Sequence, residues 1–482
     1  MGKRLILVLA LALIVGLTFG AAYAEVQNVK VSGDIIASGV LRDHFNLQNG
    51  PAGDKKDIHQ SFFMTQTRVR VDADLTDNVS ATVRLINERT WGSNANNDFG
   101  YTTSTTDSNN NWDRGMGIDL DLAYVTLKEF LYSPLTLTIG RQEIKFGNGL
   151  IIGRSVPGIY YGTDVQVPSD LSEIKAFDAI RATLNYDPLV VDLVYAKTLQ
   201  STTNRNNTAE LFGVNASYAL SKKIDVSAYY YLKSDNNAGQ LVSKRTADKV
   251  NTIGTLIAIK PIDNLATSLE AAYQFGNNDR NGLINPSNAR RHDAWAVQAM
   301  ADYTFAKMKM TPTIGGSYTY LSGGRDTGSG MNKGWDSMFY DQKLNNITYA
   351  LLPFSNLSVF NLRGSIKPVE DITVSVNYGY YDRASGTGGR EVVSPGTSGT
   401  GGNYIDSGTG VGYDVDYTGE QHLGDAVDAT VIYDYTEDVQ FGLTAGWFKS
   451  GAGLSSRVAA SGPDGSGRRD ATQLIGSMKV TF

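Results

Sequence analysis

The sequence contains no cysteine in its 482 residues, which excludes disulfide bonds, thiolate metal sites and thiol nucleophiles. Beyond residue 24 it also lacks any run of about eighteen apolar residues, so no transmembrane helix is expected there. Proline is scarce, with 12 residues, whereas glycine (51) and tyrosine (26) are plentiful. Disordered chains have fewer aromatic residues and more charge, so we expect an ordered, sheet-rich protein.

The first 24 residues have the pattern of an export signal. Lys3 and Arg4 precede an apolar run over residues 5–19, and Ala22-Tyr23-Ala24 provides a small-x-small cleavage site. The alternative is a membrane anchor, but the apolar run is short and no charged stop follows it. Removal of two cations from a chain of net charge −6 leaves a mature chain of about −8. Such an acidic protein is a poor candidate for binding nucleic acid.

Segments in which apolar and polar residues alternate recur through the mature chain. The last of them, residues 473–482, places Leu474, Met478 and Phe482 on one face and Gln473 and Lys479 on the other. Each segment has roughly the ten to fifteen residues of a tilted membrane strand. About eighteen strands are predicted, near residues 28–45, 60–74, 78–91, 117–130, 133–146, 176–187, 188–199, 208–220, 221–234, 247–261, 264–276, 292–305, 306–321, 357–368, 371–383, 421–435, 438–449 and 468–482.

Short and long gaps alternate between these segments. Every second gap is a tight turn rich in Asp, Asn or Pro, as at residues 75–77 and 436–438. The other gaps are mostly long and polar, and the largest lie near residues 92–116, 147–175, 322–356 and 384–420. Short turns on one side and long loops on the other are typical of an outer-membrane barrel, whose short turns lie in the periplasm.

Hydrocarbon offers no hydrogen-bond partner to the backbone, so a sheet in a membrane must have no edge. We therefore predict an all-β fold over residues 25–482: a transmembrane antiparallel β-barrel of 18 strands, surrounded by outer-membrane lipid. Side chains fill a barrel only up to about eight strands, so a wider barrel with a polar inner face has a water-filled lumen. Such a barrel conducts solutes unless loops plug it.

The alternation assigns several charged residues to the lumen. The strongest cluster is Arg68 and Arg70 on one predicted strand with Arg84 on the next. Arg presents a fixed fork to carboxylates, so a basic track for an anionic solute is one interpretation. The other is that these are wall residues paired across strands. The pore-lining candidates assigned in this way are Arg68, Arg70, Arg84, Arg181, Arg363, Asp72 and Glu88.

One segment does not fit the alternation. Strict period two over residues 135–146 puts Arg141 and Glu143 on the same face as Leu137 and Ile139, where charges would meet lipid. Either Gly140 carries a bulge that turns the face, or the strand leaves the membrane there. Both interpretations predict that Arg141 and Glu143 lie at the outer lumen or its rim.

Three stretches resemble the alginate-export family of outer-membrane proteins: GRQEIKFGNGLIIG (140–153), LSVFNLRGSIKPVEDITVSVNYGYY (357–381) and LGDAVDATVIYDYTEDVQFGLTAGWFKSG (423–451). The resemblance implies an eighteen-stranded monomer that moves an anionic polysaccharide or related solute outward through an Arg-lined lumen. Arg141 falls on the family's Gly-Arg-Gln motif. The chain departs from the alginate exporter in having only short periplasmic turns, with no long gating turn among them.

These observations favour a passive channel for small or polymeric anionic solutes, with inward-folding loops such as 147–175 and 322–356 contributing selectivity. The alternatives are a general non-selective porin and a barrel sheath around a periplasmic partner such as a redox protein. An enzyme is not expected, because no Ser–His pair forms a readable dyad. No metal site or cofactor is expected either, since the four histidines fall at separate strand ends. The sequence leaves an oligomer open.

Overall fold

The computed structural model describes residues 28–45, 47, 59–92, 118–155, 167–168, 170–200, 208–235, 248–278, 290–323, 331–385, 404–406, 412–414, 416–417, 420–455 and 469–482. The predicted export signal at residues 1–24 lies outside these ranges. Within them, no helix combines the length and the apolar character needed to cross a membrane.

Eighteen long strands form the wall of the molecule. They are β1 (Asn28–Asp43), β2 (His59–Thr76), β3 (Val79–Thr90), β4 (Asp119–Leu127), β5 (Leu135–Gln142), β6 (Phe177–Asn185), β7 (Leu189–Gln200), β8 (Thr208–Ser221), β9 (Ile224–Asp235), β10 (Asp248–Ile259), β11 (Leu265–Asn278), β12 (Arg290–Thr304), β13 (Thr313–Leu321), β15 (Leu357–Val369), β16 (Ile372–Asp382), β20 (His422–Asp434), β21 (Val439–Ser450) and β23 (Ala471–Thr481). The short elements are β14 (Met331–Asn332), α2 (Asn346–Leu351), β17 (Tyr404–Asp406), β18 (Gly412–Asp414), β19 (Asp416–Tyr417) and β22 (Leu454–Ser455).

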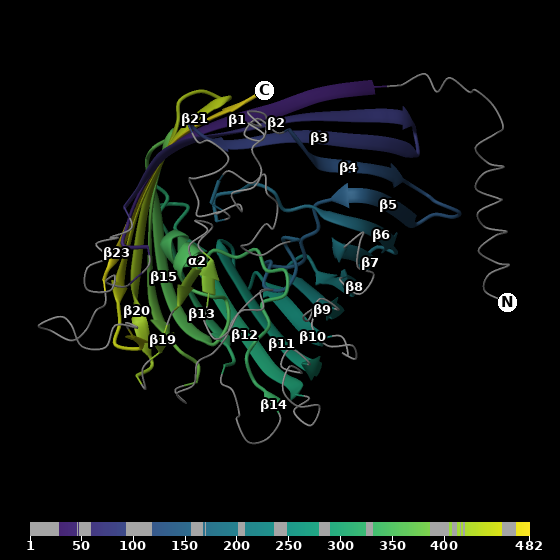
Figure 1. Ribbon diagram of the computed structural model, residues 1–482. Coiled ribbons are helices and arrows are strands. Elements are labelled where there is room, and N and C mark those ends of the chain that lie inside the picture. The colour runs from purple at the N-terminus through teal and green to yellow at the C-terminus, as the bar shows by residue number, and fades with distance from the viewer. Residues whose placement is uncertain are drawn as a thin grey trace, which may run out of the picture.

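Each long strand pairs antiparallel with its neighbours in the chain, and the first pairs with the last. β1 and β23 run in continuous register from Asp34↔Thr481 to Asp43↔Thr472, so the sheet has no free edge. This confirms the predicted all-β, 18-stranded antiparallel barrel (Figure 1). Closure satisfies the backbone groups that lipid cannot.

Side chains alternate between the two faces of the wall as the sequence predicts. Val69 and Val83 are exposed on the outer face, while Arg68 and Arg84 point inward to carboxylate partners inside the barrel. Aromatic residues lie near the strand ends, where Phe63 stacks on Trp91 at 5.3 Å between ring centroids. An apolar outer face and a polar inner face are what a lipid-embedded, water-filled barrel requires.

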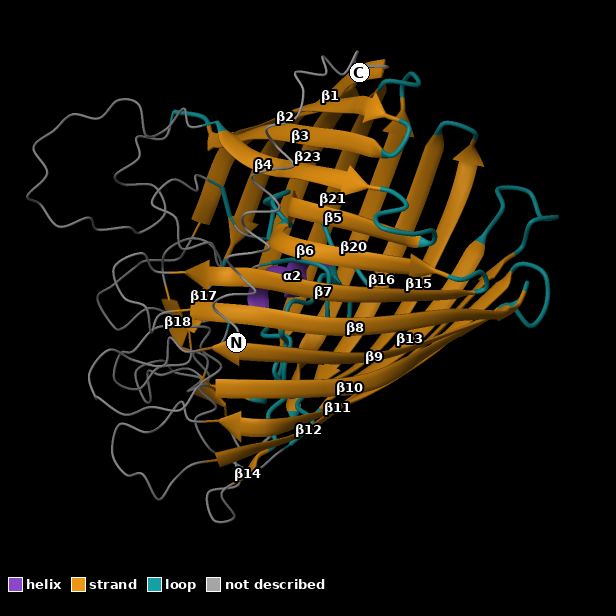
Figure 2. Ribbon diagram, turned by 90° about the vertical axis from the view of Figure 1, so that its right-hand side faces the viewer, coloured by secondary structure: helices purple, strands orange, loops and turns teal. Residues whose placement is uncertain are grey.

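The two ends of the barrel differ in their connections. At one end, the turns contain two to eight residues, from residues 77–78 between β2 and β3 to residues 305–312 between β12 and β13. These short turns lie together on one side in Figure 2. The other end carries the long connections, so the predicted asymmetry is confirmed.

Two predicted strand boundaries are wrong. The strand predicted at 306–321 begins at Thr313, because Met310 and Thr311 adopt φ of 67° and 43° in a tight turn. The alternating Lys and Met residues at 307–310 imitate a strand but belong to that turn. The strand predicted at 133–146 ends at Gln142, and the chain then enters the barrel.

The described parts of two long connections lie in the middle of the barrel. We call them the first insert (described residues 143–155, 167–168 and 170–176, after β5) and the second insert (described residues 322–323 and 331–356, after β13). Leu150 and Ile347, one from each insert, are fully buried in a shared core. α2 belongs to the second insert and lies inside the ring of strands (Figure 1). The prediction that these loops fold inward is confirmed for their described residues.

Candidate functional site

The two inserts are joined into one unit inside the barrel. Ile152 and Phe339 form a parallel bridge, and the Phe339 backbone N–H donates to the Ile151 carbonyl at 3.0 Å. The buried Arg154 guanidinium donates to the carbonyls of Ile174 (3.0 Å) and Ser172 (2.9 Å). Because these contacts run within and between the inserts, the inserts obstruct the lumen together.

The first insert is fastened to the inner face of β1–β4, which we call the charged wall. Arg42 on β1 forms a two-pronged ion pair with Asp170, and its Nε donates to Gln473 at 2.9 Å. The side chains of Arg42 and Asp170 are almost completely shielded from solvent. A charge-assisted pair of this kind is strong only while both partners are present.

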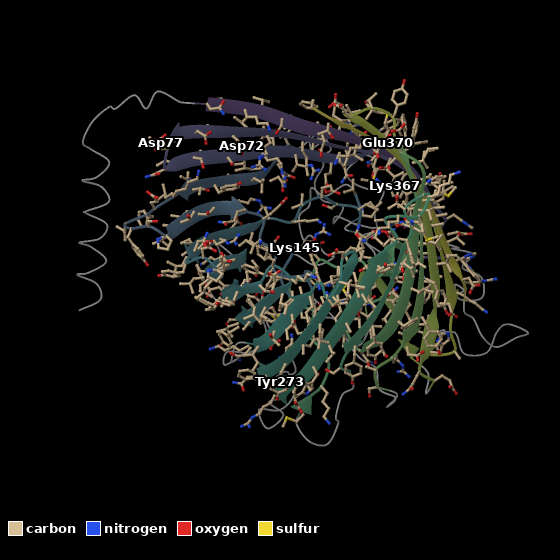
Figure 3. The ribbon with its side chains drawn as sticks, turned by 180° about the vertical axis from the view of Figure 1, so that it is seen from behind. Asp72, Asp77, Lys145, Tyr273, Lys367 and Glu370 are labelled. Atoms are coloured by element: carbon tan, nitrogen blue, oxygen red, sulfur yellow. The ribbon has the colours of Figure 1, made fainter. Side chains whose placement is uncertain are left out.

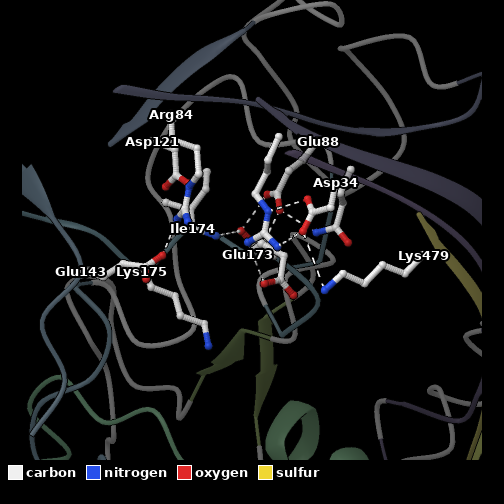
Figure 4. A network of polar contacts seen from close by, with 12 residues as sticks. Asp34, Arg84, Glu88, Asp121, Glu143, Glu173, Ile174, Lys175 and Lys479 are labelled. Carbon is white, nitrogen blue, oxygen red and sulfur yellow. Dashed lines mark hydrogen bonds and ion pairs between the residues drawn. The ribbon is translucent and has the colours of Figure 1, made fainter. Parts of the chain in front are cut away.

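Arg68 and Arg84 also hold the first insert, and Figure 4 labels Arg84 beside Asp121. Arg68 Nε donates to Asp34 at 2.8 Å, and its Nη1 donates to Glu173 of the insert at 3.2 Å. Arg84 Nε donates to Asp121 at 2.5 Å, while its Nη2 pairs with Glu143 at the start of the insert. The sequence-predicted arginine cluster is therefore brought together, but carboxylates occupy its guanidinium groups.

The two predicted acids play different parts. Asp72 pairs with Arg70 on its own strand at 2.7 Å, so it neutralises that arginine. Glu88 accepts hydrogen bonds from the Ser172 hydroxyl and the Glu173 N–H, both at 2.7 Å. Glu88 thus fixes the backbone of the insert. The remaining two candidates are paired on the inner face as well, Arg181 with Asp192 at 2.8 Å and Arg363 with Asp302 at 2.7 Å. A role of these residues in selectivity remains a prediction.

Arg141 lies at the end of β5 and on its outward face. The register places Ile139 opposite Ile180 and Arg141 opposite Asp178, so Arg141 keeps the outward face of β5. Gly140 adopts a φ of 124° without shifting the register, and the Arg141 charge is met by Asp178 at 3.4 Å. An ion pair lowers the cost of an outward charge at the end of the strand. Glu143 lies beyond the strand and turns inward to Arg84.

The second insert contacts the opposite inner face, formed by β12–β16, which we call the amide wall. Gln342 and Gln298 exchange two amide hydrogen bonds of 2.9 Å. Asn345 Nδ2 donates to the Asn377 carbonyl at 3.0 Å. Outside this wall, Lys233 on β9 holds Asp336 at 2.5 Å. Burial disfavours the charge of Asp336, but Lys233 outweighs that effect and keeps the pKa of Asp336 below its usual value.

A cavity of about 490 Å³ lies between the inserts and the amide wall. Carboxamides and charged side chains dominate its lining, with Ser317 as the hydroxyl and Met300 and Leu344 as the larger apolar members. Its polar lining residues are Lys145, Asn148, Gln298, Ser317, Asp341, Gln342, Lys343, Asn361, Arg363 and Asn377. A site of this size and polarity suits a small, hydroxyl-rich molecule.

Lys343 is the cation of this cavity that has no carboxylate partner among the residues the structure describes. Its Nζ donates to the Asp170 backbone carbonyl at 3.2 Å and lies 5.1 Å from the centre of the Tyr349 ring. The side chain is open to the cavity, yet protein encloses it deep in the barrel. This enclosure lowers the pKa of the Lys343 ammonium. By contrast, Arg363 is neutralised by Asp302.

Asp341 is the acid of the cavity lining. Burial opposes its ionisation, but the hydrogen bond from Lys175 (3.0 Å) and the charge of Lys145 (3.6 Å) keep its pKa below the usual value. Two cations share this single carboxylate. With Lys343 added, the lining carries an excess of positive charge.

Sequence reasoning missed Lys343, Lys145 and Arg154. Arg154 and Lys343 lie in the inserts beyond any alternation. Lys145 belongs to the alternating segment 135–146, which put it on the same face as Arg141 and Glu143 but did not assign it to a site. Within the described part of the chain, no group of three or more His, Asp or Glu side chains is arranged to hold a metal ion.

The alginate export family model matches residues 41–466. The chain therefore belongs to the alginate export family, and it is an outer-membrane β-barrel channel. No curated protein matches its sequence.

Solved structures of Pseudomonas aeruginosa channels are similar in fold. OccK11 (OpdR) has 11% identity and a TM-score of 0.54, with 95% of this chain and 97% of that chain covered. OpdK with vanillate has 10% identity and a TM-score of 0.51, with 94% and 99% covered. OccK2 (OpdF) in complex with glucuronate has 10% identity and a TM-score of 0.51, with 95% and 99% covered.

Proposed function

We propose that this member of the alginate export family passes small, hydroxyl-rich anionic solutes by passive diffusion, and that the cavity beside Lys343 selects them. The observation that carries the proposal is a cation that forms no ion pair with a carboxylate of the described residues and faces a cavity lined largely by amides. An anion at Lys343 would stabilise the ammonium that the protein environment disfavours. Amide groups can both donate to and accept from hydroxyls.

The inserts favour a small solute over a polysaccharide. They contact β1–β3 through Asp170, Leu171 and Glu173, and the amide wall through Gln342 and Asn345. A polymer would have to displace contacts on opposite sides of the lumen at once. A barrel that served as a sheath would need this space for its partner, whereas the chain's own inserts occupy it.

Two of the channels with a similar fold hold carboxylates, vanillate in OpdK and glucuronate in OccK2. The carboxamide lining of the present cavity suits the hydroxyl-rich glucuronate type better than an aromatic ring. We therefore extend the proposal to the acids of monosaccharides.

Liposome swelling tests this function. Vesicles containing the purified barrel should swell faster in glucuronate than in glucose, because the excess positive charge concentrates the anion. Lys343→Gln should remove that difference, whereas Lys479→Gln should keep it. Lys479 is the matched control, since it lies on the lumen wall near Asp34 at 3.8 Å and outside the cavity. Equal rates for the two solutes in the wild type, or passage of a polyuronate but not of glucuronate, would contradict the proposal.

A further inference from the structure

Six of the eight short turns at the periplasmic end form two arcs of opposite charge, and the turns at 128–134 and 186–188 belong to neither. The turns at 222–223, 260–264 and 305–312 are consecutive around the barrel and form what we call the basic arc. Its cations are Lys222, Lys223, Lys260, Lys307 and Lys309, against a single acid, Asp263.

The turns at 370–371, 435–438 and 77–78 are also consecutive around the barrel, because the closing strands β23 and β1 lie between them. We call them the acidic arc. They carry Asp77, Glu370, Asp371, Glu437 and Asp438, and no lysine or arginine. Figure 3 labels Asp77 and Glu370 in this arc, with Lys367 of β15 beside Glu370.

The lysines of the basic arc are exposed and free of ion pairs within the described residues. Their charge is therefore not cancelled locally, unlike that of the arginines in the lumen. Exposed apolar side chains stand directly beside them, namely Leu220 (61% exposed), Ile262 (55%), Met308 (56%) and Met310 (41%). A surface that combines lysine with exposed aliphatic residues fits a boundary between hydrocarbon and charged headgroups.

The basic arc is also continuous with the lipid-facing surface. Tyr218 and Leu220 are exposed on the outer face of β8 and precede Lys222 in the same strand and turn. Ile314 is exposed at the start of β13, directly after the turn that holds Lys307 and Lys309. The lipid-facing surface therefore adjoins the arc at both of its ends, which favours a lipid partner over a protein.

We propose that the basic arc is a docking surface for anionic phospholipid headgroups of the periplasmic leaflet. Each lysine near an anionic lipid surface contributes a favourable interaction that weakens with ionic strength. The acidic arc repels the same headgroups. The barrel then carries an uneven lipid shell, rich in anionic lipid beside β8–β13 and poor in it from β15 through β23 and β1 to β3. This inference does not depend on the solute that the channel passes.

The absence of cysteine allows a local test. Ile262→Cys in the basic arc and Tyr435→Cys in the acidic arc each provide one labelling site for a fluorophore, since both residues are exposed. The barrel is reconstituted in phosphatidylcholine vesicles with headgroup-region spin-labelled phosphatidylglycerol or phosphatidylcholine as the quencher. At each position, quenching gives the local concentration of spin-labelled phosphatidylglycerol relative to spin-labelled phosphatidylcholine. This ratio should be about fivefold higher at residue 262 than at residue 435, which is the factor expected from one lysine at an anionic surface.

Two charge variants complete the test. Combined Lys222→Gln, Lys223→Gln, Lys260→Gln, Lys307→Gln and Lys309→Gln should equalise the two positions. Combined Glu370→Gln, Asp371→Asn, Glu437→Gln and Asp438→Asn should raise quenching at residue 435 and leave residue 262 unchanged. Unchanged conductance would show that both variants fold.

Equal quenching at the two positions in the wild type would overturn the proposal. So would a lysine variant that keeps the full asymmetry. If the lysine variant lost binding to an acidic periplasmic protein while lipid quenching stayed unaltered, the proposal would also be overturned. The arc would then be assigned to a protein partner instead.

Discussion

The charged wall and the amide wall face each other across the same lumen, yet they hold their inserts by different chemistry. On the charged wall, Arg42, Arg68 and Arg84 each pair with a carboxylate of the first insert. On the amide wall, neutral side chains such as Gln298 and Asn377 carry the contacts, and the cavity remains open beside them. The charged wall therefore holds more arginines, but carboxylates of the first insert already neutralise Arg42, Arg68 and Arg84.

This contrast changes which residues are expected to attract an anion. A guanidinium that is paired and hydrogen-bonded offers little field to a passing solute, because the partner carboxylate cancels it. Within the described residues, Lys343 donates to a backbone carbonyl and lies over an aromatic ring, and the Asp170 and Glu173 carboxylates act on it through their charge without forming an ion pair. A single unpaired lysine on an insert can therefore outweigh several paired arginines on the wall.

The largest expected effect is on the charged wall. Arg42→Ala should cost about 3–5 kcal/mol, because it leaves the shielded Asp170 without its partner. The first insert should then detach, which raises amide hydrogen exchange in residues 170–175 and makes single-channel currents larger and noisier. Arg42→Lys keeps the charge but not the fork, so we expect an intermediate result. If Arg42→Ala kept wild-type current noise and wild-type amide hydrogen exchange, the ion pair of Arg42 with Asp170 would not be what holds the insert.

The pH dependence of selectivity tests the cavity side of the comparison. Lys343 is charged below its pKa, which enclosure lowers from the ordinary 10.5. The preference for anions should therefore be present at neutral pH and be lost as the pH rises through that lowered pKa, by about fivefold if roughly 1 kcal/mol of interaction is removed. Measured with Lys343→Gln, the preference should show no such step. A step of the same size in that variant would assign the titration to another group.

A smaller effect is expected from the neutral contacts. Gln342→Ala removes two hydrogen bonds with Gln298 and one to the Asn148 carbonyl, each worth about 1 kcal/mol. The second insert should loosen locally, and conductance should rise about twofold or less. Gln66→Ala on the charged wall, which loses a 2.9 Å bond to the Leu171 carbonyl, is the matched comparison. A larger effect from Gln66→Ala would mean that the amide contacts are not the ones that shape the cavity.

The smallest effect is expected from a paired arginine outside the insert contacts. Arg70 and Asp72 pair with each other and are about one third exposed, so their interaction is worth less than about 1 kcal/mol. The double variant Arg70→Gln/Asp72→Asn conserves net charge and should leave conductance and selectivity unchanged. A marked loss of anion preference would restore the basic-track interpretation of the charged wall.

The sequence predicts the wall well and the inserts poorly, for a physical reason. Period-two alternation reports which face a strand residue takes, so the inward positions of Arg68 and Arg363 follow from it. Contacts such as Arg42 with Asp170 join residues 128 positions apart, and no local pattern encodes them. The same holds for Lys343, whose surroundings exist only after both inserts have folded inward.

Arg141 is a strand residue for which alternation alone did not settle the prediction. The alternation assigned it to the outward face, but the cost of a charge facing lipid led to two interpretations, a bulge at Gly140 or a strand that leaves the membrane there. Asp178 on the neighbouring strand removes the need for that bulge, since the pair can remain at the end of the barrel. Cross-strand register, which the sequence does not specify for these strands, decides this position.

The most direct measurement is the zero-current potential of the channel in planar bilayers across a potassium chloride gradient. Our account predicts an anion-selective potential for the wild type. In Lys343→Gln the potential should move toward zero, because the anion-to-cation permeability ratio falls about fivefold. Lys479→Gln removes the same charge elsewhere in the lumen and should change the potential little. A potential that is insensitive to Lys343→Gln, or that changes equally in both variants, would contradict the claim that the cavity lysine sets selectivity.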